Sequence, residues 1–236
     1  MNIKKVLYLP VFLFAISACC GYSGNGNIKV PIECPLRKQG INVHNMKPFE
    51  DTEKYIEFLE RKDRDVWQKP NEIVSSLNLK GSETLVDLGA GSGYFSFRFS
   101  RALPKGKVIV IDTEPEMLRY VHHKAMSAGI KNIEPVLATY EDPKIPKNVD
   151  IVFICDVLHH VNKRAEWLAK LNLEMEKGDK LILIEFKEGK LPEGPPENIK
   201  ICGKEMLSLV CKAGFKLIKE DSTLLPYQNY FIFEKQ

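Results

Sequence analysis

The feature of this 236-residue chain that most constrains its fold is a regular alternation of short apolar runs with amphipathic stretches, which begins near residue 80. We expect strands at 84–88, 107–111, 133–137, 150–155 and 180–186, and helices at 94–102, 115–128 and 163–175. Apolar strands separated by helices predict a parallel sheet covered on both faces. A further helix at 204–212, followed by strands at 215–220 and 230–234, predicts a terminal antiparallel hairpin.

Composition narrows the class of protein without identifying it. With 44% hydrophobic and 28% charged residues, the chain is typical of a globular domain rather than a disordered or fibrous protein. The formal net charge of +3 is too small for a surface that binds a phosphate backbone. We therefore expect no nucleic-acid partner, and a local basic patch is the alternative that the net charge leaves open.

The amino terminus has the pattern of a targeting signal. Two lysines precede an apolar run that is too short to span a bilayer, which predicts a signal peptide at 1–18. Ile16-Ser-Ala-Cys19 resembles a bacterial lipobox, so we expect a lipid on Cys19 and a flexible tether at 19–47. These features predict a membrane-anchored lipoprotein on the periplasmic or extracytoplasmic face. The alternatives are an uncleaved anchor or an ordinary signal peptide on a secreted or periplasmic protein.

A charged helical segment precedes the alternating region. Residues 48–79 are helical in pattern, and 80–236 form the predicted main domain. We expect Arg64, Trp67 and Gln68 of this arm to close over a ligand. The alternative is an arm that only packs against the domain and whose charges are solvated.

The first predicted strand runs into a glycine turn and then a helix. Asp87 lies two residues before Gly89, which is followed by Ala90, Gly91 and Gly93. Glycines permit a positive φ and a close approach of a ligand to the backbone. The spacing G-x-G-x-G differs from the G-x-G-x-x-G of dinucleotide sites. An acid before the turn repels pyrophosphate and suits a cation, so the pattern favours an adenosyl ligand without phosphates over a dinucleotide.

A second acid ends the next strand. Asp112 is placed to accept hydrogen bonds from both hydroxyls of a ribose, with Thr113 beside it. Met117 is a candidate for contact with an adenine, although methionine at such a helical position is as often part of the core. The six cysteines include no CxxC and no ligand-spaced cluster with histidine, so we expect no metal site.

Asp87-x-Gly89-x-Gly91-x-Gly93 together with Asp112 resembles the class I S-adenosylmethionine-dependent methyltransferase family. The resemblance continues through Ala138-Thr-Tyr-Glu-Asp142, Asp156-Val-Leu-His-His160 and the final hairpin, over residues 80–236. The subgroup resembled is the small-molecule type that includes ubiquinone/menaquinone and arsenite methyltransferases. The resemblance implies a Rossmann-like α/β fold with a mostly parallel seven-stranded sheet of order 3-2-1-4-5-7-6, strand 7 antiparallel, and S-adenosylmethionine as cofactor.

The resemblance also implies roles for individual residues. Asp87 would bind the ammonium, Asp112 the ribose, and Asp156 would face the sulfonium, unless it is only a turn residue. An acid in the loop after strand 3 normally meets the adenine amino group, but Thr139 stands at the commonest position, and Glu141 or Asp142 would substitute. The predicted cofactor-binding residues are thus Asp87, Gly89, Ala90, Gly91, Gly93, Asp112, Thr113, Met117, Thr139, Glu141 and Asp156.

Methyl transfer from a sulfonium depends mainly on positioning, so few side chains need to react. His159 and His160 are candidates for a general base, and only one of two adjacent residues can face a substrate. The alternative is a histidine that packs beside the cofactor. Trp67 is a candidate for contact with the methyl group or the acceptor. The sequence identifies neither the acceptor nor the oligomeric state, and a non-catalytic protein that binds the nucleoside is the alternative function.

Overall fold

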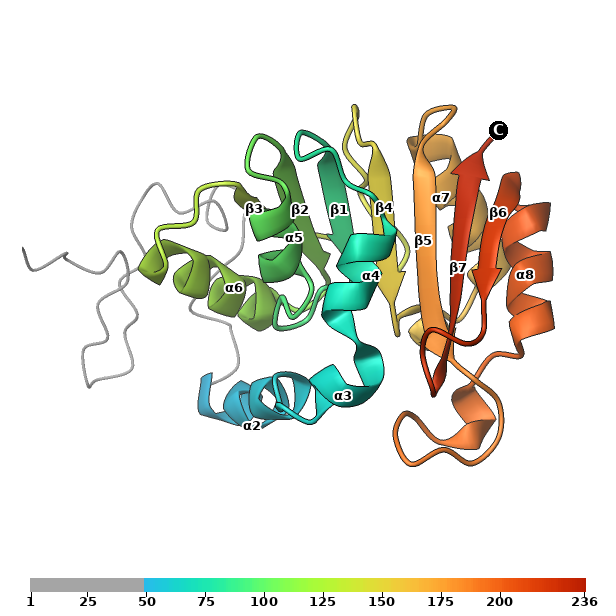
Figure 1. Ribbon diagram of the computed structural model, residues 1–236, viewed down its shortest axis with the longest axis horizontal. Coiled ribbons are helices and arrows are strands. Elements are labelled where there is room, and N and C mark those ends of the chain that lie inside the picture. Colours follow the sequence, from blue (N-terminus) through green and yellow to red (C-terminus); the bar gives the residue numbers. More distant parts are fainter. Residues whose placement is uncertain (1–48) are drawn as a thin grey trace, which may run out of the picture.

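The structure is a computed structural model that describes residues 49–236, with side chains from residue 52 onward. The predicted signal peptide, the tether and Cys19 lie outside these residues. Seven strands form one sheet in the order β3-β2-β1-β4-β5-β7-β6 (Figure 1). Their bounds are β1 Thr84–Leu88, β2 Lys107–Asp112, β3 Ile133–Leu137, β4 Ile151–Cys155, β5 Lys180–Phe186, β6 Phe215–Asp221 and β7 Gln228–Lys235.

The strand directions confirm the predicted fold class. The pairs β1–β2, β1–β4, β2–β3 and β4–β5 are parallel, whereas β7 is antiparallel to both β5 and β6. The last two strands are joined by a short connection, and a short connection returns the chain in the opposite direction. This is the order and polarity that the sequence resemblance implied.

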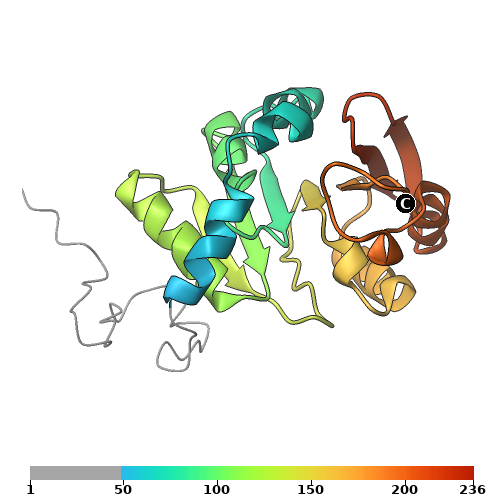
Figure 2. The ribbon, with the colours of Figure 1, turned by 90° about the horizontal axis from the view of Figure 1, so that it is seen from below.

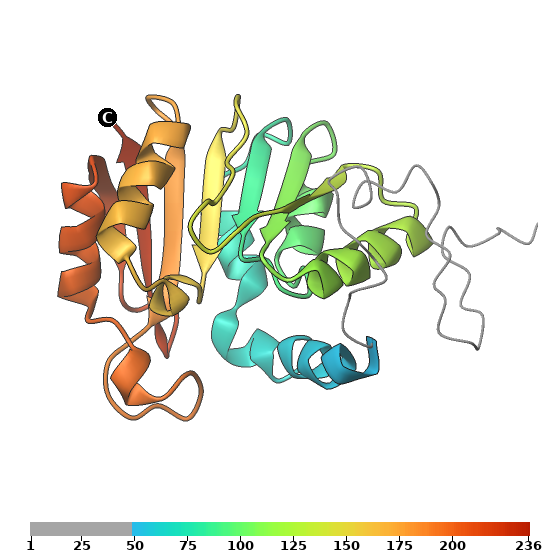
Figure 3. The same cartoon turned by 180° about the vertical axis from the view of Figure 1, so that it is seen from behind.

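Helices cover both faces of the sheet (Figures 1 and 3). Core residues of α4 (Pro70–Ser76), α5 (Ser96–Ala102) and α6 (Pro115–Ser127) pack on one face, in a cluster that includes Phe99 and Phe153. Residues of α7 (Arg164–Glu174) and α8 (Gly203–Lys212) pack on the other face, together with Phe231 and Phe233. Burial on both faces explains why the central strands are apolar without alternation.

Local sequence explains where the helices begin and end. Pro115 occupies the first turn of α6, where its missing N–H costs nothing, and Gly129 just beyond the helix takes a φ of 66°. The helix α5 begins at Ser96, two residues later than predicted, because the glycine turn extends through Gly93. None of the helices within 49–236 has the length and apolar character that crossing a membrane requires.

The amino-terminal arm passes along the edge of the sheet where the parallel strands end. It consists of α2 (Phe49–Leu59), α3 (Arg64–Gln68) and α4. In Figure 1 α2 and α3 lie beneath this edge, and in Figure 2, which looks onto the edge, α2 crosses in front of the strands. Ligands of open α/β sheets bind at the carboxyl ends of the strands, so the arm covers the expected location of the site.

Candidate active site

The glycine turn joins β1 to α5 and has the backbone conformation that its composition predicts. Gly89, Gly91 and Gly93 have φ values of 73°, 54° and 77°. A Cβ atom on Gly89 would lie 2.3 Å from Cγ2 of Val157, so only glycine fits there. A Cβ atom on Gly91 would meet Cδ1 of Leu59, from the arm, at 3.1 Å. The arm therefore lies directly over the turn.

Asp112, the last residue of β2, fixes the turn through its carboxylate. Oδ2 accepts a 2.7 Å hydrogen bond from the Gly91 N–H, and Oδ1 accepts one of 2.9 Å from the Glu114 N–H. Burial raises the pKa of Asp112, while these backbone donors act against the shift. Each carboxylate oxygen retains a second lone pair, so the group can hold the turn and still accept from a ligand hydroxyl.

Asp87 is a buried carboxyl group behind the same turn. It accepts a 2.5 Å hydrogen bond from the hydroxyl of Ser96, at the start of α5. Burial raises the pKa of Asp87 to about 7, and the positive charge of Arg64 from the arm acts in the opposite direction. A carboxyl group with this pKa becomes fully charged when a cationic ligand binds beside it.

The loop after β3 does not bring a free acid to the site. Thr139 and Glu141 are exposed, and the backbones of Thr139 and Asp142 bond to each other across a tight turn. Asp142 is paired with Lys170 of α7 at 3.2 Å. The hydroxyl of Tyr140 in the same loop donates at 3.2 Å to Oε1 of Glu114, two residues after Asp112. The structure therefore leaves the predicted adenine contact of Thr139 and Glu141 as a prediction.

The other two predicted cofactor residues follow Asp112. Thr113 is half-buried, next to the Asp112 carboxylate that holds the turn. Met117 is buried in the first turns of α6, with 4% of its surface exposed. Burial of Met117 is compatible with both of its predicted roles, a core residue and a wall against adenine.

Asp156 follows β4 directly and lies beside the glycine turn, because Leu88 of β1 pairs with Ile154 of β4. Its backbone has a φ of 60°, which is uncommon for a residue with a side chain and is best tolerated by Asp and Asn. Its carboxylate accepts hydrogen bonds from the side-chain amides of Gln68 in the arm and Gln228 in β7.

The two adjacent histidines have different environments, as expected. His159 is buried, and its Nδ1 lies 2.8 Å from Oε2 of Glu185, a buried residue of β5. Burial alone would lower the pKa of His159, but the hydrogen bond and charge of Glu185 outweigh it, so the pKa is raised. His160 is more exposed than His159. Partial burial of its ring and the neighbouring charge of His159 both lower the pKa of His160. Of the two, His159 is the one held by an acid.

Trp67 of the arm packs against aromatic side chains at the ends of β5 and β7. Its ring centroid lies 5.7 Å from that of Phe186 and 6.1 Å from that of Tyr227. The guanidinium of Arg61 lies 5.9 Å from the Trp67 ring on the arm itself. These rings pack around Trp67, and the next residue, Gln68, contacts Asp156.

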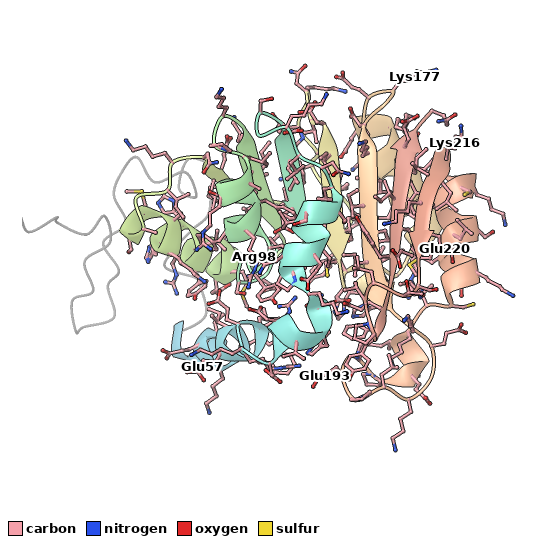
Figure 4. The ribbon with its side chains drawn as sticks, in the orientation of Figure 1. Glu57, Arg98, Lys177, Glu193, Lys216 and Glu220 are labelled. Carbon is pink, nitrogen blue, oxygen red and sulfur yellow. The ribbon has the colours of Figure 1, made fainter. Side chains whose placement is uncertain are left out.

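The arm is fastened to the domain at several points by polar contacts. Asp65 accepts hydrogen bonds from the Tyr94 hydroxyl and, at 2.9 Å, from Arg98 of α5. Glu60 pairs with Lys124 of α6, and Arg61 pairs with Glu193 in the loop after β5. Figure 4 labels Arg98, which lies above the arm, and Glu193, which lies close to α3. The arm thus contacts both α5 and α6 and the loop after β5, an arrangement that fits either a closing arm or one that only packs against the domain.

The residues at this edge suit a cationic nucleoside more than a phosphate ligand. Asp87, Asp112 and Asp156 border the turn, and the segment 89–93 contains no basic side chain. Among the described residues along this edge of the sheet, the buried atoms Ser92 Oγ, Trp67 Nε1 and Gln228 Oε1 have no hydrogen-bond partner. Such atoms are costly unless a ligand satisfies them. The donor and acceptor set therefore fits an adenosyl sulfonium with its amino-acid group.

Other predicted features concern cysteines and metals. Cys155 at the end of β4 is a free thiol whose pKa is raised well above its usual value by burial. Cys202 and Cys211 are also free thiols. Within residues 49–236, no group of three or more metal-ligating side chains is arranged to hold a metal ion.

Sequence reasoning missed Glu185, Gln228 and the Asp65 contacts with Tyr94 and Arg98. Glu185 and Gln228 are polar residues within otherwise apolar strands, and that was the available signal. The sequence predicts that Arg64, Trp67 and Gln68 of the arm close over a ligand. The structure places all three in α3, at the edge of the sheet. The roles of the individual residues stay predictions.

The amino-acid sequence of the chain is similar to those of known methyltransferases. Residues 85–176 match the family model described as "Methyltransferase domain". The ubiquinone/menaquinone biosynthesis C-methyltransferase of Francisella philomiragia is 27% identical over 130 residues, which cover 54% of this chain and 51% of that protein. The corresponding protein of Pasteurella multocida is 33% identical over 112 residues, covering 46% and 41%. The chain thus spans about half the length of these relatives.

Solved structures share the fold. A SAM-dependent methyltransferase from Aquifex aeolicus is similar with a TM-score of 0.71 and 24% identity, covering 76% of this chain and 96% of that one. The mitomycin 7-O-methyltransferase MmcR has a TM-score of 0.64 and 16% identity, covering 82% and 62%. The segment 85–176 therefore resembles methyltransferase domains, and the solved structures share its fold.

Proposed function

We propose that this chain transfers the methyl group of S-adenosylmethionine to a small or lipophilic acceptor that carries a hydroxyl group. The observation that supports this most directly is the glycine turn bordered by carboxylates, with Asp112 fastening Gly91. When bound, the cofactor supplies an electrophilic methyl group on a positively charged sulfur.

The amino-acid part of the cofactor is a zwitterion and needs both signs of charge. Asp87, with its pKa near 7, provides the anionic partner for the ammonium group. Arg64 provides a cation in the same region, and its charge already acts on both Asp87 and Asp156. Its guanidinium stacks on the ring of Tyr94 with 4.0 Å to the centroid, which holds it against the domain.

Asp112 is the partner for the ribose hydroxyls, and Met117 with Thr113 forms the adjoining wall. A carboxylate that already accepts two backbone hydrogen bonds is fixed in orientation, so its remaining lone pairs point in defined directions. Gly89, Ala90, Gly91 and Gly93 let the cofactor approach the backbone closely. This arrangement orients the nucleoside before the acceptor binds.

His159 acts as the general base. Glu185 holds Nδ1, which leaves Nε2 as the nitrogen that takes the proton. The acceptor oxygen, or the carbon that its deprotonation activates, forms the new bond to the methyl carbon. The acceptor proton would move to His159, where the negative charge of Glu185 would stabilise the imidazolium, and the bound cofactor would give up its methyl group and keep the electron pair of the broken bond on sulfur.

The arm closes the site and excludes water. Trp67, Phe186 and Tyr227 form an apolar wall that suits a lipophilic or planar acceptor. The names of the relatives from Francisella and Pasteurella refer to quinone biosynthesis, which agrees with an acceptor that carries hydroxyl groups on a ring.

Calorimetric titration tests the function. We expect the purified domain to bind S-adenosylmethionine and S-adenosylhomocysteine and to ignore NAD. With a panel of phenols and hydroquinones, it should then release S-adenosylhomocysteine. Binding of NAD in place of the adenosyl ligands would overturn the proposal, and binding without turnover on any acceptor would favour the non-catalytic alternative.

The proposal includes a lipid on Cys19, supported by the lipobox-like sequence Ile16-Ser-Ala-Cys19. Such an anchor would hold the domain at a membrane surface on the periplasmic or extracytoplasmic side, next to lipophilic acceptors. Incorporation of a labelled fatty acid into the full chain, and its loss in Cys19→Ser, is the expected result. Labelling that persists in Cys19→Ser would overturn this part alone.

A further inference from the structure

The carboxylate of Asp156 is held by two glutamines that are far apart in the sequence. Nε2 of Gln228 lies 2.7 Å from Oδ1 and 2.8 Å from Oδ2, and Nε2 of Gln68 lies 3.2 Å from Oδ2. Both glutamine side chains are fully buried. Neither comes from the element that carries Asp156, so the three residues meet only in the folded chain with the arm in place.

Each amide is oriented so that it donates to Asp156. Oε1 of Gln68 accepts from Nε of Arg64, and Nη1 of Arg64 donates to the carbonyl of Leu59 at 2.7 Å. These bonds point Nε2 of Gln68 towards the carboxylate. Oε1 of Gln228 has no partner among the described residues, so Gln228 is buried with one side unsatisfied. Burying Oε1 without a hydrogen bond costs stability. We take this cost as a sign that the Gln228 amide is retained for the hydrogen bonds that its Nε2 donates to Asp156.

The surroundings otherwise oppose a charge on Asp156. Burial and the charge of Glu185 raise its pKa, whereas Arg64, the Gln228 hydrogen bond and His159 lower it. Cys155 faces the same group, and its thiol accepts from Gln68 at 2.9 Å. Amide donors favour the charged form of a carboxyl group. The two glutamines therefore help decide whether this position is negative or neutral.

Asp156 also lies where a charge would be felt by a ligand on the glycine turn. Val157, the next residue, packs against Gly89 so closely that a Cβ atom on that glycine would lie 2.3 Å from its Cγ2. The positive charge of Arg64 acts on Asp156 and on Asp87 alike, which places both acids around one region. A carboxylate here attracts a cationic ligand more strongly than an uncharged ligand of the same shape.

We infer that Gln68 and Gln228 are positioning residues that hold Asp156 as a carboxylate, so that the site binds the sulfonium form of the cofactor more tightly than its uncharged thioether product. The inference rests on the proposed function and adds a means of distinguishing donor from product. Because Gln68 belongs to the arm, the discrimination is strongest when the arm is closed.

The test is the ratio of dissociation constants for S-adenosylhomocysteine and S-adenosylmethionine, measured by calorimetry. Gln68→Leu and Gln228→Leu remove the donors at similar volume, and Asp156→Asn removes the charge. We expect each to lower the ratio about tenfold, chiefly by weakening S-adenosylmethionine binding. In Asp156→Asn, adding Gln228→Leu should lower it no further, since both act through one carboxylate.

Val66→Ala is the matched control, because Val66 lies on α3 beside Gln68 and is 78% exposed. It should leave the ratio unchanged. If Gln228→Leu fails to fold, Gln68→Leu carries the same test from the arm. Equal weakening of both ligands in the leucine variants would show a merely structural role and overturn the inference while leaving the function intact. Failure of the wild type to bind either ligand would overturn both proposals.

Discussion

The two halves of the sheet edge are built in different ways. The cofactor half comprises the ends of β1 and β2 with the glycine turn. Backbone N–H groups of the turn hold it in place, because they donate to the Asp112 carboxylate and to the Ile111 carbonyl. The half where we propose that the acceptor binds, called the acceptor half, comprises the ends of β4 and β5, the start of β7 and the arm, and it is held by contacts between side chains, such as that of Glu185 with His159. The first half depends on a contiguous motif, whereas the second depends on residues that only the fold brings together.

This difference predicts how each half responds to change. The cofactor half should still bind the cofactor when His159 or Glu185 is changed, whereas changes to Asp156 and its two glutamines should affect cofactor binding as well. Side chains from several elements should control proton transfer, charge and closure. The following predictions run from the largest expected effect to the smallest.

Replacing His159 with alanine should lower kcat by about 10²–10⁴-fold, the usual contribution of a general base. The dissociation constant of S-adenosylmethionine should change little, because His159 belongs to the acceptor half. Steady-state kinetics and calorimetry on the same preparation provide the two measurements. If His159→Ala weakened cofactor binding as much as it lowered kcat, the distinction between the two halves would be wrong.

The companion variant Glu185→Gln tests how His159 is tuned. The wild type needs neutral His159, so activity falls as pH drops below its raised pKa. Without the charge of Glu185, that pKa falls, and the acidic limb of the kcat profile should move to lower pH while the plateau decreases. An acidic limb that does not move would exclude His159 as the base.

Asp112→Ala should weaken S-adenosylmethionine binding by about 100-fold, since it removes a charged acceptor for the ribose and the partner of the Gly91 N–H. Asp112→Asn, which keeps an oxygen acceptor of the same shape, should lose less. Calorimetry measures both variants. Retained affinity in Asp112→Ala would refute the ribose assignment.

Cofactor affinity should depend on pH through Asp87. Its pKa of about 7 means that it is mostly protonated at pH 6, and a proton must leave before it can pair with an ammonium group. We expect binding at pH 6 to be about tenfold weaker than at pH 7.5. Asp87→Asn should bind weakly at both values. A wild-type affinity independent of pH over this range would contradict an ionised Asp87 in the complex.

Asp65→Ala should have the smallest effect, about two- to fivefold on the rate of cofactor release, because exposed ion pairs contribute little. It removes the contacts of the arm with Tyr94 and Arg98 and leaves both halves of the sheet edge unchanged. Stopped-flow displacement measures the release rate, and Glu57→Ala, at an exposed arm position, is the control. An unchanged release rate would argue against a lid that opens at this contact.

The residues of the cofactor half could be predicted from the sequence because most of them lie close together along the chain. Asp87 lies near the end of one strand, the three glycines follow that strand, and Asp112 ends the next strand, so parallel pairing brings these residues together without further information. The strand order and the antiparallel β7 followed from the same resemblance. The boundaries differed by one or two residues, as at the start of α5, where local turns compete with the helix.

The acceptor half was only partly predictable. The sequence pointed to the arm and to His159, but it gave no reason to link Glu185 to His159 or Gln228 to Asp156, whose separations are 26 and 72 residues. Nor did it show that the loop after β3 leaves Thr139 and Glu141 exposed, because the backbone bonds between Thr139 and Asp142 form only in the folded loop.

The sequence by itself determined a doubly covered sheet and the glycine turn with its acids, because strand periodicity and glycine conformation are local properties of the chain. The tertiary structure decided which histidine is held by an acid, which amides hold Asp156 and where the arm is fastened. Those arrangements depend on packing between segments that are far apart in the sequence. A local sequence pattern contains no information on which of these side chains come into contact.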